Sequence, residues 1–144
     1  MTRDRGFINE DFLFRILQEA YDLGVREVGF QVAGDSFACE DFGKYVRKAK
    51  DVGFRYVFVT TNLALATPNK LKEVFDAGLD SIKISINAGS RETYKLVHGS
   101  DDFETVRENI VKLCIMYVKN AQQIVCVHCS GDTSINWYGW KVQI

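Results

Sequence analysis

Hydrophobic residues follow two alternating periods along most of the chain. Stretches with apolar side chains at helical spacing alternate with shorter stretches in which apolar and polar residues take turns. The first pattern predicts helices over 10–23, 42–52, 68–77 and 91–98, and a longer helix after Asp101. The second predicts strands over 25–32, 55–60 and 81–87. Helices and strands therefore follow one another in turn, which indicates an α/β fold.

The strand over 81–87 has the clearest alternation. One side carries Ile82, Ile84 and Ile86, and the other carries Ser81, Lys83, Ser85 and Asn87. Since helices precede and follow this strand, we expect the isoleucine side to pack on helices. The polar side then lines the lumen of a closed or half-closed barrel and can hold a polar ligand. The alternative is an ordinary antiparallel strand with one face in water.

A short repeat marks the end of three predicted helices. Asp22-Leu23-Gly24, Asp51-Val52-Gly53 and Asp76-Ala77-Gly78 are versions of one element. Glycine suits this place because the residue after a helix often takes a left-handed conformation. Repeated helix–strand units with short turns predict a parallel sheet with right-handed crossovers, here a partial (β/α) barrel with its helices outside.

Small polar residues lie at or just after the carboxyl end of each predicted strand, in 34–36, 60–62 and 85–89. Ligands of parallel α/β sheets bind at the carboxyl ends of the strands. The candidate ligand-binding residues are the polar residues at these ends together with the lysine of the polar column: Gly34, Asp35, Thr61, Asn62, Lys83, Ser85 and Asn87.

Length and charge narrow the class of protein. The 144 residues suffice for one domain over 1–144, and the net charge of −1 comes from interspersed acids and bases. The sequence has no basic stripe, so we do not expect a nucleic acid as a partner. No stretch is apolar enough to span a membrane and no leader opens the chain, so we expect a cytoplasmic location.

The four cysteines do not form a disulfide framework. Cys126 and Cys129 are a C-x-x-C pair, which could be half of a zinc site or a redox pair. A turn-like Ser130-Gly131 follows the pair where a helix would be needed, which favours a structural or accidental pair. No metal ligands are therefore assigned, and residues 114–144 have no predicted place in the fold. His98, before a glycine, is expected to cap its helix or lie on the surface.

Over 8–113, the order and spacing of these motifs resemble the core domain of radical S-adenosylmethionine (radical SAM) enzymes of the cofactor-maturation and peptide-modifying type. The resemblance rests on several motifs taken together. They are the glycine-acid turn at Gly34-Asp35, the turn at Thr61-Asn62, the strand Lys83–Asn87, the segments Glu92–Tyr94 and His98-Gly99, and the helix that carries Phe103-Glu104-x-Val106.

The resemblance implies S-adenosylmethionine as a cofactor and gives roles to the strand ends. Gly34 matches the family's Gly-Gly-Glu-Pro turn, which grips the amino group of the cofactor, and Asp35 stands in place of the glutamate. Ser85 matches the serine that contacts the cofactor, and Asn87 stands where aspartate is common. Thr61-Asn62 matches a turn that faces the substrate or the cofactor.

The resemblance also implies a [4Fe–4S] cluster held by a C-x-x-x-C-x-x-C loop, and this spacing is absent from the chain. We therefore expect a fragment of a radical SAM protein that is inactive alone, with no catalytic residue assigned. The intact protein would generate a 5′-deoxyadenosyl radical and act on an unknown small molecule or peptide. The alternatives are a partial-barrel binding module for an anionic or nucleotide-like ligand, and a small metal or thiol-redox protein. Open sheet edges favour self-association.

Overall fold

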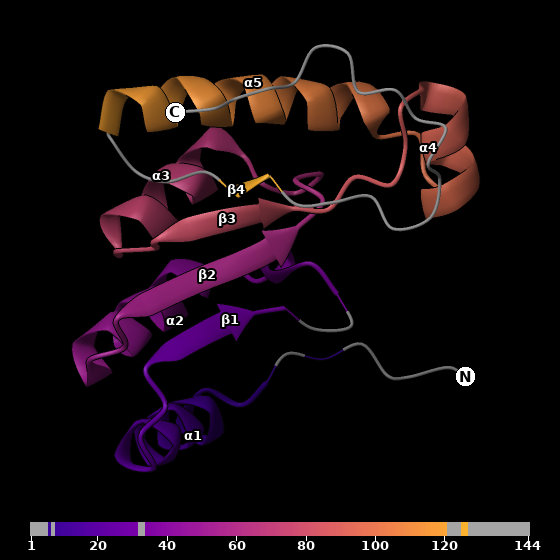
Figure 1. The fold of residues 1–144 in the computed structure, drawn as a ribbon. Coiled ribbons are helices and arrows are strands. Elements are labelled where there is room, and N and C mark those ends of the chain that lie inside the picture. Colours follow the sequence, from indigo (N-terminus) through magenta and orange to yellow (C-terminus); the bar gives the residue numbers. More distant parts are fainter. Residues whose placement is uncertain (1–5, 7, 32–33, 121–124, 127–144) are drawn as a thin grey trace.

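The computed structural model describes residues 6, 8–31, 34–120 and 125–126 (Figure 1). Five α-helices, one 3₁₀ helix and four strands alternate in these residues. In chain order they are α1 (Glu10–Asp22), β1 (Glu27–Phe30), η1 (Ser36–Ala38), α2 (Phe42–Val52), β2 (Tyr56–Thr61), α3 (Pro68–Asp76), β3 (Ser81–Ile84), α4 (Arg91–His98), α5 (Phe103–Asn120) and β4 (Val125–Cys126).

The strands form one parallel sheet in the order β1-β2-β3-β4. Glu27 of β1 lies opposite Tyr56 of β2, and Phe58 of β2 lies opposite Ser81 of β3. A sheet in which each strand pairs with the next one along the chain is the arrangement of a (β/α) barrel. The parallel α/β fold is therefore confirmed, and a partial barrel is consistent with this strand order.

Helix ends follow the sequence signals. The side chains of Asn9, Thr67 and Ser90 each accept a hydrogen bond from a backbone N–H in the first turn of the helix that follows. The three repeat glycines, Gly24, Gly53 and Gly78, have φ values of 97°, 114° and 96°. These are left-handed conformations that an L side chain rarely adopts, so the repeat sets the turn from each helix into the next strand.

The hydrophobic core lies between the sheet and its helices, and Figure 1 shows α2 and α3 behind the strands. Ile82 and Ile84 of β3 are buried there, and Ile86 packs against the same core. The helices contribute the residues that the helical pattern predicts to face inward, among them Phe42, Val46, Ala49, Leu71, Val74, Val106 and Leu113. The predicted orientation of the isoleucines is confirmed.

Two local predictions are wrong. The helical spacing of Leu13, Ile16, Leu17 and Ala20 predicts one inward stripe on α1. Ile16 is instead 39% exposed, and Leu17 is the buried residue of this helix. The spacing Asp101-x-x-Glu104 in the sequence predicts a capping box at the start of the last helix. Helix α5 instead begins at Phe103, and Glu104 pairs with Arg107 on the surface.

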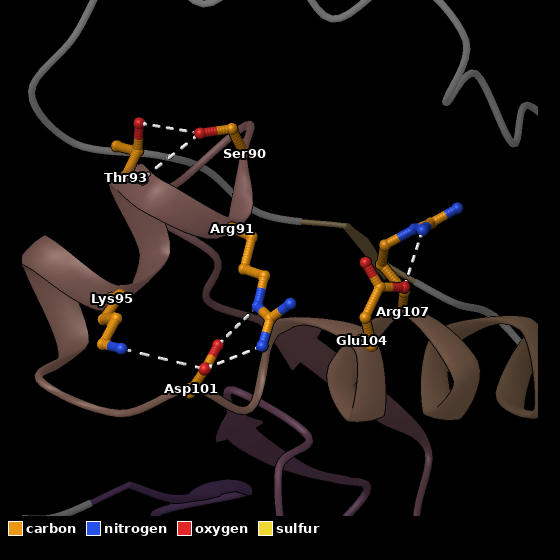
Figure 2. A network of polar contacts seen from close by, with 7 residues as sticks. All are labelled: Ser90, Arg91, Thr93, Lys95, Asp101, Glu104 and Arg107. Atoms are coloured by element: carbon orange, nitrogen blue, oxygen red, sulfur yellow. Dashed lines mark hydrogen bonds and ion pairs between the residues drawn. The ribbon is translucent and has the colours of Figure 1, made fainter.

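Asp101 belongs to a surface network between α4 and the start of α5 (Figure 2). Arg91 donates two hydrogen bonds to the Asp101 carboxylate, at 2.7 and 2.8 Å, and Lys95 lies 3.8 Å from it. The hydrogen bonds from Arg91 lower the pKa of Asp101, and the same contact raises the pKa of Arg91. The pair ties α4 to the loop that follows it, which explains why Asp101 does not serve as a cap.

The last described strand is short. Val125 and Cys126 pair with Lys83 and Ile84 of β3, in the part of the chain for which the sequence predicts no place in the fold. Cys129 and the tail beyond it lie outside the described residues, so the C-x-x-C pair is described only at Cys126. Of the helices that the structure describes, none has the length and apolar character to cross a bilayer.

Candidate functional site

The carboxyl ends of β1 and β2 are joined by a hydrogen bond between side chains. The Thr61 hydroxyl donates to Oδ2 of Asp35 at 2.6 Å, and Oδ1 of Asp35 accepts from the backbone N–H of Phe37 at 2.9 Å. Asp35 thereby caps η1 while its carboxylate is held from the neighbouring strand. A carboxylate has about four acceptor positions, so one fixed in this way can still accept further hydrogen bonds from a ligand.

The turn after β2 has a strained residue at its centre. Leu63 is buried and has a φ of 66°, a conformation that is uncommon for a residue with a side chain. Its N–H donates to the Thr61 hydroxyl at 2.9 Å, and its carbonyl accepts from the side-chain amide of Asn109 at 2.8 Å. Asn62 closes the turn by accepting from the backbone of Ala64.

Asn109 was not predicted as a site residue. It is 7% exposed and lies on α5 between the inward-facing Val106 and Ile110. A polar side chain inside an apolar helical stripe was the available signal. Because Asn109 donates to the carbonyl of Leu63, it positions the Thr61-Asn62 turn from a helix 46 residues later in the chain.

The other predicted site residues differ in how closely they lie to the Thr61-Asn62 turn. Gly34 is exposed, and a Cβ placed on it would meet no atom within 4 Å, so its backbone faces open space. The backbone N–H of Ser85 donates to the carbonyl of Thr61 at 2.9 Å, which places Ser85 beside the turn. Asn87 is half-buried in the loop before α4, and no hydrogen bond among the described residues links it to the others.

Lys83 lies opposite Thr60 of β2, on the face of the sheet opposite the core. Its Nζ is 3.7 Å from the centroid of the Phe58 ring, a cation–π contact. A Cβ on Gly29 would come within 2.3 Å of the same ring, so the absent side chain lets the ring lie against β1. Residues of β1, β2 and β3 therefore together position the ammonium group of Lys83.

Helix α4 lies beyond the carboxyl ends of the strands, on the side to which the arrows point in Figure 1. Tyr94 is buried and stacks on His98, with 4.3 Å between ring centroids. The Tyr94 hydroxyl and His98 Nε2 are buried and have no hydrogen-bond partner among the described residues. The prediction of a capping or surface histidine is thus wrong, because His98 packs inward on Tyr94.

Burial raises the pKa of Tyr94, and the carboxylates of Asp102 and Asp35 act in the same direction. The phenol therefore stays protonated at neutral pH and remains a donor. Ser100 is close enough to lower the pKa of Tyr94, but its hydroxyl does not form a hydrogen bond of normal geometry with the phenol. A buried donor without an acceptor is unusual in a folded protein, so this side of the site has unused capacity for hydrogen bonding.

The described residues offer no cluster ligands. No group of three His, Cys, Asp or Glu side chains in this part of the chain could hold a metal ion. Cys39 and Cys114 are free thiols, and burial raises the pKa of Cys114, which makes it a poorer thiolate ligand.

Comparison with known proteins identifies the family of this polar strand edge. A model of the radical SAM superfamily matches residues 1–135. The chain belongs to the radical SAM superfamily. The family expected from the motifs between Gly34 and Phe103 is confirmed, and with it the family's cofactors, S-adenosylmethionine and a [4Fe–4S] cluster in the intact protein.

Among curated relatives, a probable GTP 3′,8-cyclase of Saccharolobus islandicus is 34% identical over 109 residues, which are 74% of this chain and 34% of the relative. One from Methanothermobacter thermautotrophicus is 28% identical over 110 residues, 76% of this chain and 35% of the relative. An uncharacterised protein of Methanocaldococcus jannaschii is 44% identical over 96 residues, 67% of this chain and 33% of that protein. The chain spans about a third of the length of these relatives.

A solved structure shares the fold. The crystal structure of BtrN in complex with AdoMet and 2-DOIA matches with a TM-score of 0.57 and 14% identity, over 88% of this chain and 46% of that chain. This likeness supports the radical SAM type of α/β fold.

The two cofactors of the family fit the described residues differently. The strand edge fits S-adenosylmethionine, because a fixed carboxylate at Asp35 and the open space beside the exposed Gly34 suit a ligand with an ammonium group. The [4Fe–4S] cluster does not fit, since no described group supplies three thiolates.

Proposed function

We propose that this chain is the part of a radical SAM core that holds S-adenosylmethionine at the carboxyl ends of β1, β2 and β3. When bound next to a reduced [4Fe–4S] cluster, this cofactor supplies the radical chemistry of the family. The cluster ligands would come from outside the described residues, and the chain alone would be inactive. A cytoplasmic location is part of the proposal, because thiolate ligands of such clusters need a reducing compartment.

The observation that carries this proposal is the hydrogen bond between Thr61 and Asp35. It fixes a carboxylate across two strand ends, next to the exposed backbone of Gly34. We infer that Asp35 accepts a hydrogen bond from the cofactor's ammonium group. Ser85, Asn62 and Asn87 flank the same edge and would contact the remainder of the cofactor.

The substrate of the intact protein is a separate question. The names of two relatives give GTP as the molecule on which those enzymes act. GTP is therefore the first of the small-molecule candidates to test, and a peptide remains the other class.

The variant Asp35→Asn tests the site. Asparagine keeps an oxygen that can accept from Phe37 and removes the negative charge. A hydrogen bond to a charged group is worth about 1.5–3 kcal/mol, so we expect the affinity for S-adenosylmethionine to fall by about tenfold or more. The affinity for 5′-methylthioadenosine, which lacks the ammonium group, should change little. Isothermal titration with both molecules measures the difference.

Asp41→Asn is the matched control. Asp41 is exposed, lies before α2 and makes no capping hydrogen bond, so the substitution makes the same charge change elsewhere on the surface. The proposal is wrong if Asp35→Asn leaves the affinity for S-adenosylmethionine as high as Asp41→Asn does.

A second candidate function is a binding module for an anionic ligand without radical chemistry. Lys83 favours it, since no ion pair among the described residues engages its ammonium group. High affinity for an anion, together with no affinity for S-adenosylmethionine, would favour this candidate.

We also propose that the chain self-associates through the side of the sheet that ends in β1. Within the described sheet, β1 pairs on one side only, with β2. The segment before β1, in and around α1, also has exposed apolar side chains, namely Ile8, Phe12, Ile16, Leu23 and Val25. An unpaired strand edge beside an apolar patch promotes association.

Sedimentation velocity should therefore show species larger than a monomer. Phe12→Lys, on the exposed patch, should raise the monomer fraction. Leu96→Lys, at an 85% exposed position on α4, should not. A wild-type chain that sediments as a monomer at all accessible concentrations would contradict this prediction.

A further inference from the structure

The face of the sheet opposite the core carries a single cation among the described residues of β1 to β3. Side chains of this face are Glu27, Tyr56, Phe58, Thr60, Ser81 and Lys83, with Gly29 opposite Phe58. We call it the concave face, because it is the inner face of the partial barrel. Apart from Glu27 at the β1 edge, the side chains around Lys83 are neutral.

The ammonium group of Lys83 is held in place without being neutralised. The Phe58 ring lies under it at 3.7 Å, and the ring can lie there because Gly29 has no Cβ to occupy its place. The neighbouring Tyr56 ring, 5.7 Å from Phe58, is fixed by a hydrogen bond of 2.5 Å between its hydroxyl and that of Ser81. A cation–π contact orients a lysine but leaves its N–H donors free for an anion.

Other half-buried lysines show the contrast. Lys50 donates to the carboxylate of Asp80 at 2.9 Å, and Lys70 donates to the carbonyl of Phe37 at 2.6 Å. Lys83 has no such oxygen among the described residues. Partial burial also strengthens any contact that it makes with an anion, because the local dielectric is lower than in water.

Lys83 is close to the strand-end site. It lies opposite Thr60, whose hydroxyl donates to Gln31 at 2.9 Å. Ser85 comes two residues later and its N–H bonds Thr61, so the alternation of β3 would put it on the same face as Lys83. Two residues of a strand span about 7 Å. A group bound at Lys83 would thus lie beside a ligand bound at Ser85, and both would face the same side of the sheet.

We propose that Lys83 binds an anionic oxygen group of the substrate, a phosphate or a carboxylate, on the concave face beside the cofactor. The inference rests on the proposed function, since it takes the strand ends as the place of S-adenosylmethionine. It assigns Lys83 to the substrate, where the sequence had grouped it with the cofactor-binding residues. The substrate class is accordingly an anion.

The test compares Lys83→Met with Lys83→Arg in the 144-residue chain. Methionine keeps the length of the side chain and removes the charge, and arginine keeps the charge. The probes are pyrophosphate, malonate and S-adenosylmethionine. Binding of each is measured by NMR titration from the changes in the amide chemical shifts of β2 and β3. We expect Lys83→Met to weaken binding of pyrophosphate, malonate or both by about tenfold or more. Lys83→Arg should keep most of this affinity, and S-adenosylmethionine should bind all three chains within about twofold.

Lys48→Met is the control, because Lys48 lies 5.4 Å from the Phe14 ring on the helix side of the molecule. It removes a similar cation–π lysine away from the concave face and should change neither affinity. Phe58→Leu removes the ring under the ammonium group and should weaken anion binding by about two- to fivefold. Circular dichroism of each variant verifies that the fold is kept.

Two results would overturn the inference: anion binding that is absent or unaffected by Lys83→Met, and a loss of S-adenosylmethionine binding in that variant. The second would assign Lys83 to the carboxylate of the cofactor and leave the proposed function standing. Conversely, if the wild-type chain binds no S-adenosylmethionine while anion binding still depends on Lys83, the anion site stands and the proposed function fails.

Discussion

Replacing Ile84 by alanine should destabilise the protein by about 2–5 kcal/mol. Ile84 is 4% exposed and lies on the core face of β3, so the truncation leaves a cavity between the sheet and its helices. The surrounding side chains come from both a strand and helices, which limits how far the cavity can collapse. Urea denaturation at low protein concentration, followed by circular dichroism, measures the change in unfolding free energy.

The neighbouring residue provides the control. Ser85 comes directly after β3, is half-buried, and joins β2 through its backbone N–H, which donates to the carbonyl of Thr61. Ser85→Ala should therefore cost less than about 1 kcal/mol. Equal losses in the two variants would mean that the faces of β3 are assigned the wrong way round.

The orientation of β3 could be predicted because it depends on a period that the sequence carries by itself. Three isoleucines at alternate positions, between two helical segments, leave one choice of buried face. The repeat glycines were equally readable, since Gly24, Gly53 and Gly78 perform one local task in three places. Signals of this kind act within a few residues, and the structure confirms them.

The contacts that build the candidate site join residues far apart in the chain. The hydrogen bond between Asp35 and Thr61 spans 26 residues, and that between Asn109 and Leu63 spans 46. Each depends on the register of strands or on the docking of a helix, which no local pattern specifies. The sequence could name Asp35 and Thr61 as strand-end residues, but it could not show that one holds the other.

The predictions for Asp101 and His98 were wrong for a related reason. Each carries a local signal, a capping spacing in the first case and a helix end in the second. Tertiary partners outweighed both signals, because Arg91 engages Asp101 through two hydrogen bonds and Tyr94 stacks on His98. Arg91 lies ten residues before Asp101, and the loop after α4 brings the two together.

Incubation of this chain with S-adenosylmethionine and a reductant should yield no 5′-deoxyadenosine, even after anaerobic reconstitution with iron and sulfide. Cleavage in this family requires three thiolates at C-x-x-x-C-x-x-C spacing, and the four cysteines, Cys39, Cys114, Cys126 and Cys129, do not have it. In the proposed site Asp35 and Ser85 would position the cofactor, but no side chain of the strand edge could deliver an electron to its sulfonium. The polar contacts contribute about 1 kcal/mol each, so we expect weak binding and no turnover.

Chromatography of the quenched reaction measures 5′-deoxyadenosine, and the double variant Cys126→Ala, Cys129→Ala identifies the source of any product. Product that disappears in the double variant would show that this pair, whose first cysteine is the last residue of β4, ligates a cluster after all. Product that persists in the double variant would contradict the premise that cleavage requires three cysteine thiolates at C-x-x-x-C-x-x-C spacing. If neither chain forms product while S-adenosylmethionine still binds in an Asp35-dependent way, the strand edge acts as a cofactor-holding unit whose redox partner must be supplied by other residues.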